Sequence, residues 1–430
     1  MLWRTVARSS SATWLAPLLA AFVAVLLSDD LTASVTLGYW PSAVGAATFA
    51  LPFVAPACAA AGAWEGSRFT RGNVAGWAPA RSGLATALPL LVPVIVLGAL
   101  GMAVAAALTI STAHPRAGLP PVDMVAMVVV WPVVLAAHSM AGFLLGKRLP
   151  LVVAASLALV LSFVLTAYPA AMEPVWLRHM VTGGMTSCCS LDQAPDWQAA
   201  ASAVVLACGV IAAAAVALTA PAARLRRTLI GAALVVGLAG SGCLAYGLPA
   251  DPAIPRAAEQ LQCAGDNPRV CLWPELSGHS GMVRRNVADA RQRLQHAGLA
   301  VPGTLTMEEH PGKGAAFIGS WPEPTPSVVR AGVGSTFLPS GPPACAQSGS
   351  SPPGADAYGP TAAWLSLTAG AASEDVAGHY GAKDTAIAAG VRHSGGDEQL
   401  AWFRHNSKAL RDCTTHPAPV PAHPARETAR

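Results

Sequence analysis

The chain has 430 residues, of which 53% are hydrophobic and only 12% are charged. Soluble domains carry about a quarter charged residues, so this composition excludes an ordinary soluble protein and favours a membrane protein. The formal net charge of +4 arises within the first 250 residues, beside apolar runs. We therefore interpret it as loop charge, and nucleic acid is not an expected partner.

Hydrophobic runs of roughly 20 residues, the length that a helix needs to cross a bilayer, recur along the first part of the chain. We expect seven spans, and they lie near residues 12–27, 41–63, 83–110, 122–145, 150–172, 198–219 and 228–248. The first run follows Arg4 and Arg8 and has no convincing cleavage site before the next apolar run. A retained signal-anchor is therefore favoured over a secretory signal.

Basic residues predict the orientation of these spans. With the N-terminus inside, ten Lys/Arg fall in inner segments and only Arg116 and Arg178 in short outer loops. The inner set is Arg4, Arg8, Arg68, Arg71, Arg81, Lys147, Arg148, Arg224, Arg226 and Arg227. This positive-inside bias predicts a multi-pass plasma-membrane protein whose residues from 250 onward lie outside the cell.

The positions of the cysteines also favour an outer location for the terminal region. Cys58, Cys208 and Cys243 lie within expected spans, and the other six lie in segments expected outside, where disulfides persist. Four cysteines of the terminal domain allow three pairings, and we favour Cys263 with Cys271 and Cys345 with Cys413. The alternative is that all four are reduced and buried.

Residues 250–413 predict a small α+β domain. Strand-like runs occur at Arg269–Trp273, Gly314–Gly319 and Ser327–Leu338, and a helical pattern covers Met282–Ala297. Pro360 suits the first turn of a second helix that runs toward Ala371, and Asp397 suits the cap of a third. We expect an irregular loop at 339–356 and a disordered tail at 414–430.

Catalytic and metal motifs are weak in this sequence. Glu308-Glu309-His310 and the stretch from His393 to Glu398 lack the spacing of a zinc peptidase, so no metal ligand, cofactor or catalytic residue is predicted. The segment from Gly278 to Gly281 resembles a nucleophile elbow around Ser280, but Met282 replaces the required glycine. We expect a polar turn in which Ser280 caps the next helix, with an anchored hydrolase as the alternative.

The centres of the expected spans are free of charge except for His138, which is the one ionisable residue well inside. A hydrogen bond from His138 to a backbone carbonyl of a neighbouring helix is favoured over a role in proton transfer. Prolines at 52, 56, 89, 93 and 132 predict kinks. No phosphate-binding loop occurs, so the chain cannot energise transport alone.

Two segments carry a family resemblance: Gly38–Arg68, with the run GYWPSAVGAATFALPFVAPAC, and Val270–Glu275, with the sequence VCLWPE. They resemble uncharacterised multi-span proteins of high-G+C Gram-positive bacteria, which are similar to exporter-type ABC permease subunits. The resemblance implies a permease-like subunit that acts with a separate ATPase on an unknown substrate, and it carries over no catalytic residue. Its six-span pattern differs from the seven spans expected here.

By the same resemblance, the inner loop from Trp64 to Ser82 is the candidate for coupling to an ATPase. Its candidate residues are Trp64, Glu65, Arg68, Arg71 and Trp77. The alternative is an ordinary positively charged loop. The expected partners are the bilayer, an ATPase subunit and further copies of this chain. A second function remains open, in which the spans form a non-transporting scaffold or sensor whose outer domain binds a cell-envelope ligand or partner.

Overall fold

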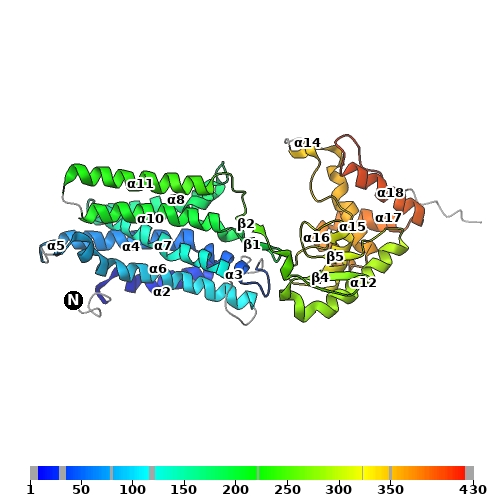
Figure 1. The fold of residues 1–430 in the computed structure, drawn as a ribbon, viewed down its shortest axis with the longest axis horizontal. Helices are drawn as coiled ribbons and strands as arrows, with labels where there is room; N and C mark the ends of the chain where they lie inside the picture. Colours follow the sequence, from blue (N-terminus) through cyan, green and yellow to red (C-terminus); the bar gives the residue numbers. More distant parts are fainter. Residues whose placement is uncertain are drawn as a thin grey trace, which may run out of the picture. The chain divides into compact units, whose positions relative to one another are not determined.

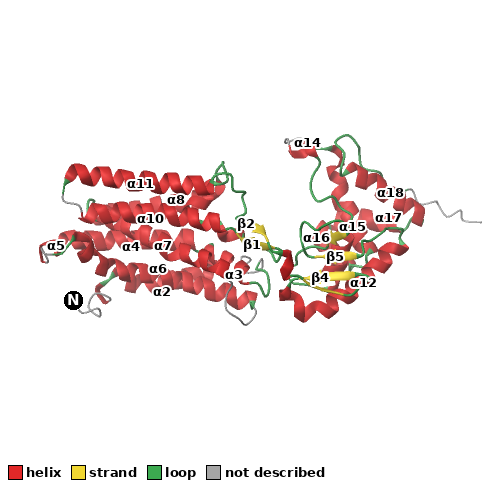
Figure 2. Ribbon diagram, viewed as in Figure 1, coloured by secondary structure: helices red, strands yellow, loops and turns green. Residues whose placement is uncertain are grey.

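The computed structural model describes residues 8–28, 35–77, 81–115, 122–219, 222–321, 323–347 and 351–421. The chain divides into two compact units, Met1–Pro255 and Arg256–Arg430. We call them the N-terminal unit and the C-terminal unit and describe each by itself. Figure 1 gives the labels of the helices and strands, and Figure 2 shows that helices predominate in both units.

The N-terminal unit is a bundle of long apolar helices with short helices and two strands between them (Figure 1). The long helices are α2 (Ser11–Leu26), α4 (Leu51–Arg71), α6 (Gly83–Ala113), α7 (Val122–Gly146), α8 (Leu151–Ala167), α10 (Trp197–Thr219) and α11 (Ala223–Ala245). The short elements are α3 (Trp40–Thr48), α5 (Val74–Trp77), η1 (Tyr168–Ala171), α9 (Leu177–Thr182), η2 (Met185–Ser187), β1 (Gln193–Pro195) and β2 (Ala253–Pro255).

Length and apolar composition make five of the described helices candidate membrane spans, and a bent helix pair makes a sixth. The pair is α3 and α4, which meet at an angle of 47°. The run expected at 12–27 forms α2, an apolar helix of 16 residues that is shorter than the others. Helices therefore occupy all the expected runs, and they are compatible with an integral membrane protein.

The helix of the second expected span continues into the first part of the predicted inner loop. Apolar character ends near Ala63, but no residue from Trp64 to Arg71 breaks a helix, and α4 ends only at Gly72. Arg68 and Arg71 lie in its last turn, where cations interact favourably with the helix dipole. The predicted loop is thus two further turns of α4, followed by the single turn α5.

Four glycines bring α4 and α7 into backbone contact. A Cβ built on Gly62 would lie 2.3 Å from the Ser139 carbonyl oxygen, and one on Gly66 would lie 2.1 Å from that of Phe143. On α7, a Cβ built on Gly142 would lie 2.0 Å from the Ala59 carbonyl oxygen, and one built on Gly146 would lie 1.9 Å from that of Ala63. We call these four residues the glycine seam, because small residues four apart allow two helix backbones to approach closely.

The two ends of the bundle differ in chemistry. At one end the Lys147 ammonium lies 4.9 Å from the centre of the Phe69 ring. Desolvation lowers the pKa of Lys147, and the charges of Arg148 and Arg226 lower it further. Segments that the sequence predicts to lie inside thus meet at this end, which we call the basic end.

Loops that the sequence predicts to lie outside meet at the opposite end of the N-terminal unit. There the Tyr39 hydroxyl donates to the Gln193 carbonyl, and the Gly38 amide donates to the Ala113 carbonyl at 2.7 Å. Strand β1 pairs antiparallel with β2 at this end, which joins the loop before α10 to the segment after α11.

Helix α11 packs mainly against α10. Gly209 and Gly237 face each other so closely that a Cβ on either would lie within 2.9 Å of the other's Cα. The Ser202 and Ser241 hydroxyl oxygens lie 2.9 Å apart, and both serines are buried. Several large apolar side chains of α11 are exposed, which suits contact with lipid: Leu225, Leu229, Leu234, Val235, Val236 and Leu238.

The C-terminal unit combines a small sheet with a set of helices. Its strands are β3 (Gln262–Ala264), β4 (Arg269–Leu272), β5 (Thr304–Thr306) and β6 (Ala315–Phe317). Its α-helices are α12 (Ser280–His296), α13 (Pro326–Ser335), α14 (Ala344–Gln347), α15 (Tyr358–Thr368), α16 (Ser373–Tyr380), α17 (Ala382–Arg392) and α18 (Gly396–Ala409). Short 3-10 turns occur at η3 (Ala258–Gln260), η4 (Pro274–His279) and η5 (Pro353–Ala357).

The sheet order is β3-β4-β5-β6, in which β3 pairs antiparallel and the other three strands run parallel. Helix α12 connects β4 to β5, as a parallel pair requires. The sheet is therefore mixed and mostly parallel. Its strands alternate with a helix along the chain more closely than in the α+β arrangement that the sequence predicts. Val270, Leu305 and Val287 are buried and form part of its core.

Some of the expected elements are present in the C-terminal unit. Strands β4 and β6 and helix α12 lie where the sequence predicts them, and Gly298 follows α12 with a φ of +82°. The prediction of a strand at Ser327–Leu338 is wrong, because α13 covers most of it. Thr325 caps this helix by accepting a hydrogen bond from the Val328 amide, and Pro326 fills its first position.

Three further expectations need correction. Asp397 does not cap α18, because Gly395 is the N-cap residue and Asp397 lies in the first turn. The expected loop at 339–356 contains α14 and part of η5, and its residues 348–350 lie outside the described part. The expected disordered tail packs on α18 at its start, because the Trp402 indole donates to the Ala418 carbonyl at 3.2 Å. Residues 422–430 lie outside the described part.

Disulfides join Cys263 to Cys271 and Cys345 to Cys413, which are the pairs that the sequence favours. Their loops differ greatly in length, with sequence separations of 8 and 68 residues. On chain-entropy grounds the longer loop stabilises the fold by about 2 kcal/mol more than the shorter one. A third disulfide joins the neighbours Cys188 and Cys189.

The glycine seam predicts a position-specific effect of one methyl group. We expect Gly142→Ala to lower the apparent melting temperature of the detergent-solubilised protein, because its Cβ would meet the Ala59 carbonyl oxygen at 2.0 Å. Overpacking of this kind costs about 1–3 kcal/mol. The matched control is Gly242→Ala on α11, where a Cβ meets nothing within 4 Å. Equal melting temperatures for the two variants would contradict the seam.

Candidate functional site

Glu65 is the centre of a polar network at the basic end, within the stretch that the sequence nominates for coupling. Its side chain is fully buried, although Glu is rarely buried without partners. Glu65 Oε1 accepts hydrogen bonds from the Ser10 hydroxyl at 3.2 Å, the Ser11 amide at 3.0 Å and the Ser11 hydroxyl at 3.1 Å. We call this arrangement the Glu65 network.

Arg68 completes the Glu65 network from the next turn of α4. Its Nη1 lies 3.1 Å from Glu65 Oε2 and also donates to the Ser9 carbonyl at 2.5 Å. One carboxylate and one guanidinium thereby tie the start of α2 to the end of α4. Because Ser10 also caps α2, the carboxylate lies at a helix N-terminus, where negative charge is favourable.

The other residues nominated for coupling differ in exposure. Trp64 is 45% exposed, and Arg71 is exposed in the last turn of α4. Glu65 is sealed and cannot contact a partner directly, so its position is structural. Trp77 ends the short helix α5, and its side chain lies outside the described part. Within the nominated stretch, the described exposed residues therefore include Trp64, Arg71 and the turn at Gly72–Asn73.

His138 interacts differently from the expected contact to a backbone carbonyl. Its Nδ1 lies 2.8 Å from the Ser162 hydroxyl oxygen, which links α7 to α8. This hydrogen bond satisfies one ring nitrogen between two packed helices. The arrangement stabilises the helix pair and needs no proton transfer.

Ser280 lacks the environment of a nucleophile. It is the first residue of α12 and does not cap this helix, because its hydroxyl donates to the Ser277 carbonyl at 2.8 Å. Arg284 Nη2 donates to the same hydroxyl at 3.1 Å. Among the described residues, no hydrogen bond joins the Ser280 hydroxyl to a His, Asp or Glu side chain. Among those residues, no group of three or more His, Cys, Asp or Glu side chains could hold a metal ion.

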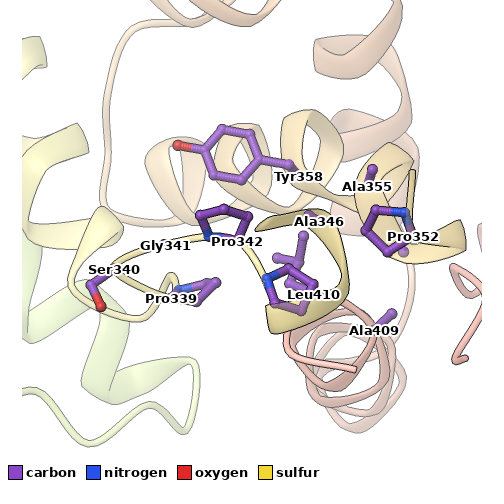
Figure 3. Close-up of a pocket in the computed structure, with 12 residues that line it drawn as sticks. Pro339, Ser340, Gly341, Pro342, Ala346, Pro352, Ala355, Tyr358, Ala409 and Leu410 are labelled. Carbon is purple, nitrogen blue, oxygen red and sulfur yellow. The ribbon is translucent and has the colours of Figure 1, made fainter. Parts of the chain in front are cut away.

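Proline side chains line a cavity of about 370 Å³ in the C-terminal unit. Figure 3 shows Pro339 and Pro342 on one side of it and Pro352 and Ala355 on the other, with Tyr358 and Leu410 closing it. The Cys345–Cys413 disulfide lies in the same region of the chain. Most of its lining residues are apolar, and Ser340 and Tyr358 add hydroxyl groups, so it offers no charged group to a ligand.

A second cavity of about 680 Å³ lies between α13 and α16. Its lining combines Trp321, Tyr358 and Tyr380 with the carboxylates Glu374 and Asp375. We call it the aromatic cavity. The sequence analysis missed it, because its residues come from four separate segments and no single motif joins them.

Comparison with known protein families gives a match in the C-terminal unit. Residues 270–413 match the model of a domain of unknown function (DUF7224). The matched stretch starts in β4 and ends at Cys413, so it covers most of the C-terminal unit and none of the N-terminal unit. No curated protein and no solved structure matches the chain.

The Glu65 network predicts a stability effect far from any exposed surface. We expect Glu65→Gln to lower the apparent melting temperature, because the amide keeps an acceptor but removes the charge that pairs with Arg68. Loss of hydrogen bonds to a charged group costs about 1–3 kcal/mol. Glu173→Gln, which changes an exposed carboxylate of the same unit, is the control. An unchanged melting temperature for Glu65→Gln would show that the network contributes nothing to stability.

Proposed function

We propose that the chain is a permease-like membrane subunit that acts with a separate ATPase at its basic end. The observation that carries this proposal is the gathering of the loops at opposite ends of the bundle. Lys147, Phe69 and Arg226 meet at one end, and the strands β1 and β2 pair at the other. The positive-inside bias then favours the basic end as the cytoplasmic one.

The short helix α5 supports the same proposal. It follows the Gly72 C-cap of α4 and precedes Ser82, the N-cap of α6, so it lies at the basic end between two candidate spans. The Glu65 network fixes the last turns of α4 against the start of α2. A force applied to α5 by a partner would therefore reach both α2 and the glycine seam through one rigid helix.

A scaffold or sensor is the second candidate function. The cavities of the C-terminal unit favour it, because a binding site there requires no transport. In that case the N-terminal unit holds the C-terminal unit at the membrane, and no ATPase is needed. The two proposals differ in whether a nucleotide-binding subunit associates with the basic end.

Partner recovery separates the two proposals. We expect the full chain, solubilised with a mild detergent from its native membranes, to co-purify with an ATPase subunit. Arg71→Glu should reduce the recovery of that subunit several-fold, because it reverses an exposed charge beside α5. The quantity to measure is nucleotide-dependent ATPase activity per mole of purified chain.

Arg227→Glu is the matched control for Arg71→Glu. It reverses an exposed charge in a different loop of the sequence-predicted inner set, at the start of α11. Equal losses in both variants would indicate nonspecific charge attraction and would contradict a role for the α5 segment. Failure to recover any nucleotide-binding subunit with the unmodified chain would favour the scaffold.

The orientation yields a separate prediction. A C-terminal epitope tag should be accessible to antibody in intact cells, and an N-terminal tag only after the membrane is permeabilised. Terminal tags are preferable to thiol labelling, because Cys413 is held in a disulfide. The reverse accessibility would overturn the proposed orientation and, with it, the cytoplasmic position of the basic end.

A further inference from the structure

The aromatic cavity has the size and lining of a ligand site. Its volume of about 680 Å³ falls within the range of small-molecule pockets. It is bordered by the segment after β6, by α13 and by α16, and Tyr358 contributes from the start of α15. All these elements belong to the C-terminal unit, so a ligand could bind there whether or not the N-terminal unit transports a substrate.

Trp321 presents an unused donor at this cavity. The residue is 6% exposed, and its indole N–H makes no hydrogen bond to any described residue, whereas the Trp273, Trp364 and Trp402 indoles all do. Since Trp321 lines the cavity, this N–H is available to a molecule that enters it. A ligand atom that accepts a hydrogen bond would supply a partner here.

Two glycines, Gly332 of α13 and Gly319 of the segment after β6, leave room for the Trp321 ring. A Cβ on Gly332 would lie 2.8 Å from Trp321 Cζ2, and one on Gly319 would lie 2.9 Å from its Nε1. Gly319 also has a φ of +100°, which favours glycine. Larger residues at either position would displace the ring from the cavity wall.

Tyr380 and Tyr358 add two further rings. Both rings line the aromatic cavity. Burial raises the pKa of Tyr380, so the phenol stays neutral at physiological pH. His379 packs edge-on against Tyr380, with ring centres 4.6 Å apart. Neutral aromatic rings present their negative faces to a cation.

Glu374 and Asp375 lie on the same cavity and have no cationic partner. No Lys or Arg nitrogen of the described residues lies within 4.0 Å of either carboxylate. Their place in the first turn of α16 is favourable for the helix dipole, which accounts for acidic residues there. The helix dipole does not account for the three aromatic rings on the same cavity, or for an indole N–H that makes no hydrogen bond to a described residue.

We propose that the aromatic cavity binds an organic ammonium compound that also carries a hydrogen-bond acceptor. The carboxylates Glu374 and Asp375 attract the positive group, and the rings of Trp321, Tyr358 and Tyr380 enclose it. The Trp321 indole donates to the acceptor. Phosphate-bearing and other anionic ligands are disfavoured, because the two carboxylates repel them.

Choline is a suitable probe, because it combines a quaternary ammonium with a hydroxyl group. The full chain, purified in a maltoside detergent that carries no ammonium group, is titrated with choline by isothermal calorimetry. The neutral isostere 3,3-dimethyl-1-butanol is titrated in parallel. We expect choline to bind and the isostere to bind at least about tenfold more weakly, which corresponds to the loss of a charge-assisted contact.

Variants locate the binding. Glu374→Gln combined with Asp375→Asn should weaken choline binding about tenfold or more. Glu308→Gln combined with Glu309→Gln removes an equal charge from the same unit outside the cavity, and it should leave the affinity unchanged. Trp321→Phe keeps an aromatic ring but removes the donor, so it should weaken choline more than tetramethylammonium, which has no acceptor.

Three results would overturn the proposal. They are the absence of choline binding, equal affinity for choline and its neutral isostere, and equal affinity in the two double variants. None of these results concerns an ATPase. The ligand proposal and the permease proposal can therefore fail separately.

Discussion

The close approach of α4 and α7 is the constraint on which the rest of the N-terminal unit depends. Apolar side chains gain little from burial in a bilayer whose lipid is equally apolar, so helix pairs there depend on packing and backbone contact. The glycine seam supplies that contact from both helices, with Gly62 and Gly66 facing Gly142 and Gly146 across the pair. The Glu65 network is attached to the same helix pair, because Glu65 lies in α4 between the seam residues Gly62 and Gly66. Closing the seam therefore also fixes where α2 begins.

Most of the bundle was predictable, because the thickness of the bilayer's hydrocarbon core sets the length of each span and its apolar interior disfavours charged residues along that length. What was not predictable depends on local backbone geometry. The break between α3 and α4 falls at Phe49–Ala50, before Pro52, whereas the interior prolines Pro56 and Pro132 lie within continuous helices. The extension of α4 to Arg71 was not predictable from hydropathy, because apolar character ends near Ala63 while the helix continues. A buried Glu65 shows why, since a polar residue can be helical and sealed when its partners come from another helix.

The C-terminal unit was less predictable, and its residues show the reason. The run from Ser327 to Leu338 has the valines of a strand, but Thr325 and Pro326 start a helix in which Val329 and Val333 are buried on one face. Helices α16 and α17 were not predicted, because their alanine and glycine content gives a weak apolar period. The aromatic cavity joins Trp321, Tyr358 and Tyr380 across 60 residues of sequence. Such a site has no linear signature, so only the fold brings it together.

Helix α11 is peripheral to the bundle, and this clarifies what it contributes. The glycine seam and the Glu65 network lie among other helices. Helix α11 packs mainly on α10, through Gly209, Gly237 and the Ser202–Ser241 pair, and to a smaller extent on α9. Beyond the basic residues of its first turns, exposed Leu and Val side chains of α11 suit contact with lipid. Removing it would leave the packing of α4 and α7 intact, but the chain would end at the basic end. With it, the chain returns to the opposite end, where β2 pairs with β1 just before the C-terminal unit starts. The contribution of α11 is therefore positional: it determines the end of the bundle from which the C-terminal unit continues.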